Sequence, residues 1–173
     1  RSQTVTGVQT CALPILSPAV YRGGGAPAWS RWALYTPQLE RIGPLLMRQL
    51  GGDPGERLLR SAYADAERLR PEVLAAYRRA TDVREWDRAL WELVQASREP
   101  RLEGRLDEIA MPALVVTGTE DQIVPPDQTR RLADALPNAR LIEFSDCGHV
   151  PQEECAERLV REVRAWWEAA LAP

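Results

Sequence analysis

One histidine and a small group of acidic residues carry most of the chemistry that this sequence offers. His149 is the only histidine among 173 residues, so any imidazole chemistry of the chain must use it. An imidazole can take a proton from a nucleophile or from water near neutral pH and return it to a leaving group. A carboxylate beside the ring fixes its tautomer and stabilises the imidazolium that forms. We pair His149 with Asp121, and the nearby acids that could serve instead are Glu120, Asp127 and Asp146.

The elements expected around these two residues would bring them together. Residues 113–117 form a continuous apolar run, which is typical of a strand buried on both faces. Residues 127–136 predict a helix, and residues 140–144 predict a second strand. A strand–helix–strand crossover makes the strands parallel, and loops at the carboxyl ends of parallel strands emerge at one edge of the sheet. Because Asp121 and His149 each follow one of these strands, we expect both side chains on one rim.

The residues before the first of these strands are expected to be mostly helical. Residues 16–21 are interpreted as the end of another strand, and residues 22–27, with three glycines in a row, as a flexible exit from the sheet. Residues 30–100 form a helical block without a strand signal. Pro37 and Pro44 are expected to divide the first part of this block into short pieces.

Two helices have strong apolar patterns. Residues 83–97 predict a helix with one apolar face, made of Val83, Trp86, Leu90, Leu93 and Val94. Residues 152–171 predict a closing helix with an apolar face of Leu159, Val163, Trp166 and Leu171. Such stripes are more often core than ligand contacts. A role in lining a substrate pocket is left open for Trp86 and Trp91.

The composition excludes several function classes. The net charge of −3, with acidic and basic residues interleaved, offers no basic face for nucleic acid or for an anionic membrane surface. No apolar run approaches the roughly 20 residues that are needed to span a bilayer. The three cysteines are an odd number without framework spacing, so we expect a reducing compartment and a cytoplasmic protein.

Two chemical roles for the cysteines have little support. Cys147, His149 and Cys155 could be taken as metal ligands, but they are only three and lack a paired C-x-x-C spacing. Cys147 as a nucleophile would lie too close to His149 along the chain. We therefore expect no metal and no cofactor.

The first residues are interpreted as foreign to the protein. Residues 5–15, with the sequence VTGVQTCALPI, resemble the conceptual translation of a common sequencing adapter along their whole length. We therefore assign residues 1–15 to a non-native segment and expect native sequence to begin near Leu16. The alternative is a native strand, because residues 12–16 are apolar.

Two motifs, taken together, resemble the α/β-hydrolase family. They are GTEDQIVPP at residues 118–126 and GHVPQEE at residues 148–154. In that family the aspartate of the first motif is the acid of a catalytic triad and the histidine of the second is its base, which implies these roles for Asp121 and His149. The resemblance implies an α/β fold with parallel strands, a crossover helix and an incomplete sheet. It divides the chain into a strand exit at 16–29, a helical lid at 30–100 and the C-terminal βαβα part of the hydrolase core at 101–173.

The nucleophile of such a triad is not found in the sequence. The family places it ahead of the acid on a G-x-S-x-G elbow. The five serines from residue 16 onward, which are Ser17, Ser30, Ser61, Ser97 and Ser145, lack that glycine frame. The upstream loop that would supply an oxyanion hole is not found either. We therefore expect a fragment that is inactive alone, from a parent whose nucleophile is serine, aspartate or cysteine.

The intact parent is expected to be a hydrolase of small molecules. Candidate bonds are esters, lactones and carbon–carbon bonds, with epoxides and carbon–halogen bonds if the nucleophile is aspartate. The alternative is a non-catalytic, ligand-binding member of the same fold. Retention of both Asp121 and His149 favours the hydrolase. The substrate and the oligomeric state are left open.

Overall fold

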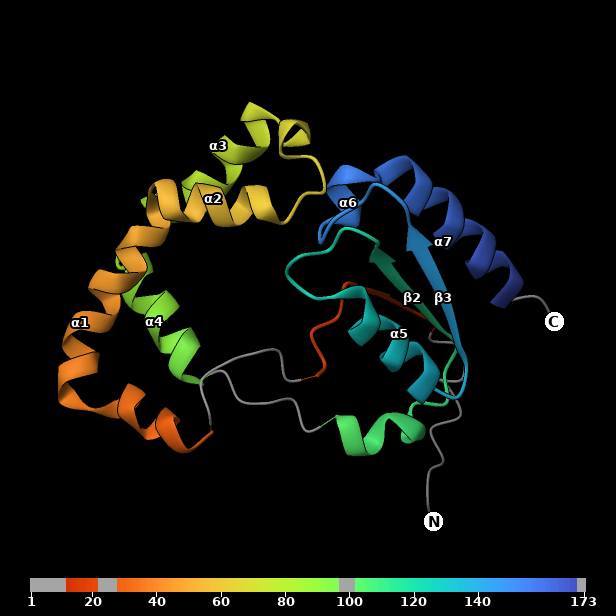
Figure 1. The fold of residues 1–173 in the computed structure, drawn as a ribbon, viewed down its shortest axis with the longest axis horizontal. Coiled ribbons are helices and arrows are strands. Elements are labelled where there is room, and N and C mark those ends of the chain that lie inside the picture. Colours follow the sequence, from red (N-terminus) through yellow and green to blue (C-terminus); the bar gives the residue numbers. More distant parts are fainter. Residues whose placement is uncertain (1–11, 22–27, 97–101, 171–173) are drawn as a thin grey trace, which may run out of the picture.

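A small sheet with its helices lies beside a crescent of further helices in the computed structural model (Figure 1). The structure describes residues 12–21, 28–96 and 102–170. Most of the adapter-like segment and the glycines at 23–25 lie outside the described residues.

The sheet has three parallel strands. β1 (Leu13–Leu16), β2 (Ala113–Gly118) and β3 (Ala139–Phe144) lie in the order β1-β2-β3, with β2 in the centre. The chain crosses from β2 to β3 through α5 (Pro126–Ala135). The parallel α/β architecture that the sequence predicts is therefore confirmed.

β1 includes residues that the sequence assigns to the adapter-like segment. Leu13, Pro14 and Ile15 pair with β2, opposite residues 113–115. An apolar stretch can lie beside a buried strand whatever its source, so this pairing does not test the origin of residues 1–15. That assignment stays a prediction.

Helices cover both faces of the sheet. β2 is buried along its whole length, as predicted for a strand between two helical layers. Successive side chains of a strand point to opposite faces, so β2 contributes to two clusters. One cluster packs with α7 (Ala156–Ala170) and includes Leu114, Val116, Phe144, Leu159 and Trp166. The other packs with α5 and includes Ala113, Val115, Leu132 and Leu136.

The closing helix is interrupted. Where the sequence predicts one helix, the structure has α6 (Pro151–Glu154) and α7, separated at Cys155. The predicted apolar face of α7 is confirmed at Leu159 and Trp166, which are buried. Leu171 lies outside the described residues. The interruption allows α6 to turn away from the axis of α7 and lie next to the loop that follows β3 (Figure 1).

The remaining helices lie mainly in residues 28–96, which we call the helical segment. Its elements in chain order are η1 (Ala28–Tyr35), α1 (Pro37–Arg48), η2 (Gln49–Gly51), α2 (Asp53–Ser61), η3 (Ala66–Arg68), α3 (Pro71–Arg79), η4 (Ala80–Asp82) and α4 (Trp86–Ala96). A short η5 (Glu103–Glu108) then precedes β2. Among the described helices, none has the length and apolar character needed to cross a membrane.

α1 is longer than the sequence predicts. The prediction that Pro44 divides this region is wrong, because Pro44 lies inside α1. A proline in a helix interior removes one backbone hydrogen bond and costs about 3 kcal/mol. Packing opposes that cost, since Gly43 is buried and lies directly against the indole ring of Trp91 from α4. Tertiary contact therefore overrides the local signal.

The buried face of α4 also differs from the predicted stripe. Val83 precedes the helix, and Val83 and Leu93 are 63% and 61% exposed. Asp87 and Trp91 are the buried residues instead. Asp87 Oδ2 accepts a hydrogen bond from Arg48 Nε at 2.5 Å, which joins α4 to α1. The apolar period correctly indicates a helix, but contacts with α1 select a different face.

Gly43→Ala tests whether the contact between α1 and α4 stabilises the protein. A β-carbon at Gly43 would overlap the indole ring of Trp91. We expect the substitution to lower the free energy of unfolding by about 1–3 kcal/mol, as overpacking does. Urea unfolding followed by tryptophan fluorescence measures the change.

Gly104→Ala is the matched control. Apart from its chain neighbours, a β-carbon there meets nothing within 4 Å among the described residues. The free energy of unfolding should change by less than about 1 kcal/mol. Equal losses in the two variants would contradict the packing argument.

Candidate active site

Asp121 lies at the carboxyl edge of the sheet, three residues beyond β2. Its side chain is fully buried, at 0% exposure. Oδ1 accepts hydrogen bonds from the backbone amides of Ile123 at 2.9 Å and Val124 at 2.8 Å. These two amides fix the carboxylate within its own loop, because each occupies a defined direction around the oxygen.

His149 lies in the loop after β3, and its ring faces Asp121. Nδ1 is 2.9 Å from Oδ2 and 3.2 Å from Oδ1 of that carboxylate. Since a carboxylate can only accept, Nδ1 carries the proton and neutral His149 has Nε2 free of a proton. The side chain of His149 is 28% exposed. Among the described residues, none hydrogen-bonds to Nε2, so this nitrogen is available to take up a proton.

The two loops are held together by their backbones. The amide of Thr119 donates to the carbonyl of Phe144 at 2.9 Å, and the amide of Glu120 donates to the carbonyl of Cys147 at 3.0 Å. At Gly118, a β-carbon would overlap the carbonyl oxygens of Cys147 and Gly148. Only glycine allows this approach, which sets the spacing between the acid and the histidine.

The environment of Asp121 favours its charged form. Burial, the largest single influence, raises the pKa of this carboxyl. The hydrogen bonds from His149, Val124 and Ile123 and the charge of His149 together outweigh burial, so the pKa lies below its ordinary value of 3.8. A carboxylate at this position can stabilise an imidazolium throughout the neutral range.

The alternative acids are placed differently. Glu120, Asp127 and Asp146 are all exposed, whereas Asp121 is buried against the imidazole. Asp146 has a positive φ of 53° and turns the loop after β3. Asp121 is therefore the acid that the structure brings to His149.

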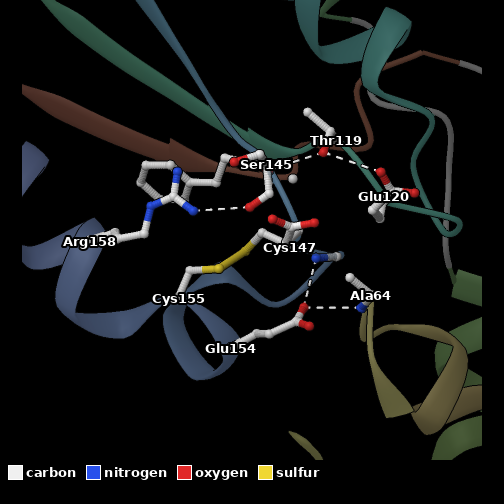
Figure 2. The surroundings of a disulfide bond; sticks show 12 residues. Ala64, Thr119, Glu120, Ser145, Cys147, Glu154, Cys155 and Arg158 are labelled. Carbon is white, nitrogen blue, oxygen red and sulfur yellow. Dashed lines mark hydrogen bonds between the residues drawn. A yellow bond between two sulfur atoms is a disulfide. The ribbon is translucent and has the colours of Figure 1, made fainter.

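A disulfide joins Cys147 and Cys155 (Figure 2). The sequence did not predict this pair, because the three cysteines show no framework spacing, and the disulfide removes the ground on which a reducing compartment was expected. Both residues are buried in the cluster that packs with α7. The bond closes a short loop that contains His149 and α6, and it occupies the two sulfurs that a metal site with His149 would need.

Trp86 and Trp91 pack within the helical segment. Trp91 is 6% exposed and lies against Gly43. The Trp86 ring approaches Gly51, where an added β-carbon would be 3.0 Å from Cζ2. These contacts make both rings part of the packing of the helical segment. The sequence favoured this role over one in lining a substrate pocket.

Sequence reasoning missed Glu154. Its side chain is fully buried, at 0% exposure, next to the loop that holds His149. A buried carboxylate needs hydrogen-bond donors, but its donors come mostly from backbone amides of distant residues. Only its position in the GHVPQEE motif could have pointed to it.

Comparisons with known proteins identify the family. A family model described as "alpha/beta hydrolase fold" matches residues 30–156. The chain therefore belongs to the α/β-hydrolase family. The esterase of Thermogutta terrifontis has a similar structure, with a TM-score of 0.68 and 20% identity over 93% of this chain and 57% of that chain.

Two curated relatives are enzymes by name. The chain is 51% identical over 59 residues to a 2-hydroxy-6-oxononadienedioate/2-hydroxy-6-oxononatrienedioate hydrolase of Burkholderia vietnamiensis, over 34% of this chain and 20% of that protein. It is 31% identical over 110 residues to a pimeloyl-[acyl-carrier protein] methyl ester esterase of Aromatoleum aromaticum, over 61% of this chain and 38% of that protein. The chain thus matches well under half the length of either relative.

Asp121→Asn should change how stability depends on pH. Because the pKa of folded Asp121 is lowered, its stabilisation is fully present above the ordinary pKa of 3.8 and is lost as the pH falls through the folded value. At pH 7 we expect the variant to be less stable by about 1–3 kcal/mol, the range for hydrogen bonds to charged groups. The difference should shrink below about pH 4. Urea unfolding between pH 7 and pH 3 measures it.

Glu120→Gln provides the comparison, since Glu120 is the exposed neighbour. Its free energy of unfolding should follow the wild type within about 0.5 kcal/mol at every pH. A difference between wild type and Asp121→Asn that stays constant down to pH 3 would exclude the assigned linkage.

Proposed function

We propose that the complete protein is a hydrolase that uses a nucleophile–histidine–aspartate triad. His149 is the general base and Asp121 the acid that orients it. The nucleophile is supplied by a part of the complete protein outside these 173 residues. The observation that carries this proposal is the contact of His149 Nδ1 with the buried Asp121 carboxylate at 2.9 Å, on the carboxyl edge of parallel strands.

The proposed chemistry uses the unprotonated Nε2 of His149. Nε2 takes the proton of the nucleophile as the nucleophile attacks the substrate carbon. Asp121 stabilises the imidazolium that results, and His149 then returns the proton to the leaving group. His149 then takes a proton from a water molecule, which attacks the covalent intermediate. It returns this proton to the nucleophile as the second product leaves. This requires the tautomer with the proton on Nδ1, which Asp121 selects.

We assign the helical segment to a lid over the substrate. The amide of His149 donates to the carbonyl of Ala62 at 2.7 Å, so the segment touches the backbone of the proposed base. Elements that border a site in this way can enclose a substrate and exclude water. The substrate is a small molecule, and the named relatives favour an ester or a 2-hydroxy-6-oxo dienedioate.

His149→Ala in the complete protein tests the triad. We expect kcat/KM for p-nitrophenyl esters or for 2-hydroxy-6-oxononadienedioate to fall at least about 10³-fold, as expected when a triad member is removed. Glu157→Gln, at an exposed position of α7, should leave it within about twofold. Full activity after His149→Ala would overturn the proposed function, and ligand binding without turnover by the wild type would favour a non-catalytic member.

The 173-residue chain alone should not hydrolyse these substrates. Its sequence has no G-x-S-x-G elbow to present a nucleophile to His149, so its rate should equal that of its own His149→Ala variant. The measurement is release of p-nitrophenol at high protein concentration. Turnover that disappears with His149→Ala would place the nucleophile inside this chain.

A further inference from the structure

The buried carboxylate of Glu154 joins two distant parts of the chain. Oε2 accepts hydrogen bonds from the amides of Gly148 at 2.7 Å and Ala64 at 3.1 Å (Figure 2). Oε1 accepts from the amide of Asp65 at 3.2 Å and from Arg68 Nη1 at 3.3 Å. One donor thus comes from the residue before His149, two come from the turn after α2, and one comes from Arg68 in η3. Both oxygens are in use, which is how a carboxylate with no solvent contact is satisfied.

The same two parts touch directly beside Glu154. The amide of His149 donates to the carbonyl of Ala62 at 2.7 Å. At Gly148, an added β-carbon would lie 2.5 Å from the Ala62 oxygen and 2.7 Å from the Ala64 nitrogen. The histidine loop and the turn after α2 therefore form one hydrogen-bonded unit, and Glu154 supplies the acceptors in its interior.

Two tyrosines of the helical segment bind Glu153, the residue of α6 next to Glu154. Glu153 accepts hydrogen bonds from the hydroxyl of Tyr63 and, at 2.8 Å, from the hydroxyl of Tyr77. Tyr63 is 3% exposed. α6 thus contacts the helical segment through two adjacent carboxylates, of which only Glu154 also reaches the histidine loop.

We propose that Glu154 is a positioning residue that holds His149 against Asp121 and ties the histidine loop to the helical segment. The positioning role matters for catalysis only through the proposed function, in which His149 is the base. Asp121 belongs to the loop after β2, whereas Glu154 acts on the backbone of the loop after β3. The ring of His149 meets Asp121 only while its backbone stays in place, so releasing Gly148 loosens the Nδ1–carboxylate contact. Movement of the turn after α2 would act on the same contact.

Glu154→Gln tests this proposal in the 173-residue chain. A glutamine has one acceptor oxygen, and its amide group would face backbone N–H donors, so at least two of the four hydrogen bonds are lost. Because His149 is the only histidine, its ring nitrogens give unambiguous signals in ¹⁵N spectra. The wild type at pH 8.5 should hold the Nδ1–H tautomer. In the variant we expect a mixture that includes the Nε2–H form, with amide exchange at Gly148 and His149 at least about tenfold faster.

Glu157→Gln is the matched control, three residues further along the chain and exposed. It should keep the wild-type tautomer and exchange rates within about twofold. A wild-type tautomer and unchanged exchange in Glu154→Gln would overturn the proposal. The same changes in both variants would also overturn it, since they would reflect general loosening of the fold.

Arg68→Ala keeps the test decisive if Glu154→Gln does not fold. Arg68 approaches from the surface, with a side chain 44% exposed, and also donates to the carbonyl of Asp146 at 2.7 Å. Its removal therefore loosens the histidine loop at two points and leaves the three backbone donors to Glu154 in place. We expect severalfold faster exchange at Gly148 and Asp65 and a smaller tautomer shift in the same direction. Unchanged exchange and tautomer would count against the proposal.

The two proposals fail separately. If Glu154→Gln shifts the tautomer while His149→Ala leaves the complete protein active, the positioning role holds and the hydrolase function is wrong. If His149→Ala is inactive but Glu154→Gln leaves the tautomer unchanged, the function holds and the positioning role is wrong.

Discussion

The close approach of two backbones at Gly118 is the constraint on which the candidate site depends. The loops after β2 and β3 start from neighbouring parallel strands, and Thr119, the first residue beyond β2, already donates a backbone hydrogen bond to Phe144 at the end of β3. A side chain at Gly118 would separate them. With that separation, Asp121 would still be held by its own loop, but His149 would move with the other loop. The contact between acid and imidazole is therefore a property of the sheet edge as much as of the two residues.

The sequence was sufficient for the parts of this arrangement that follow from chain order. Residues 113–116 are all apolar because β2 is covered on both faces, and that run predicted a strand buried on both faces. A strand–helix–strand unit has one favoured hand, so the meeting of Asp121 and His149 could be inferred without any distance. Position along the chain did not separate Asp121 from Glu120, which follows β2 one residue earlier, and the choice of Asp121 came from the resemblance of residues 118–126 to a family motif.

What the sequence could not provide depends on contacts between distant segments. Pro44 continues a helix, and Asp87 is buried, because α1 and α4 pack together around Gly43 and Trp91. Cys147 and Cys155 become partners because α6 turns the chain back. Neither periodicity nor spacing describes these contacts. Errors of prediction therefore gather where the helical segment and α6 pack, and are few in the sheet, where local pattern and burial coincide.

Two buried carboxylates contact the loop that carries His149 in different ways. Asp121 binds the ring directly, while Glu154 binds the backbone that carries the ring. Burying a carboxylate is costly unless donors surround it, and both are surrounded chiefly by backbone amides. Amides of the polypeptide do not titrate, so these contacts to the two carboxylates do not change with pH. Under the proposed function, His149 must change its protonation during turnover while its position stays constant, and contacts to the ring from Asp121 and to the backbone from Glu154 would meet both requirements.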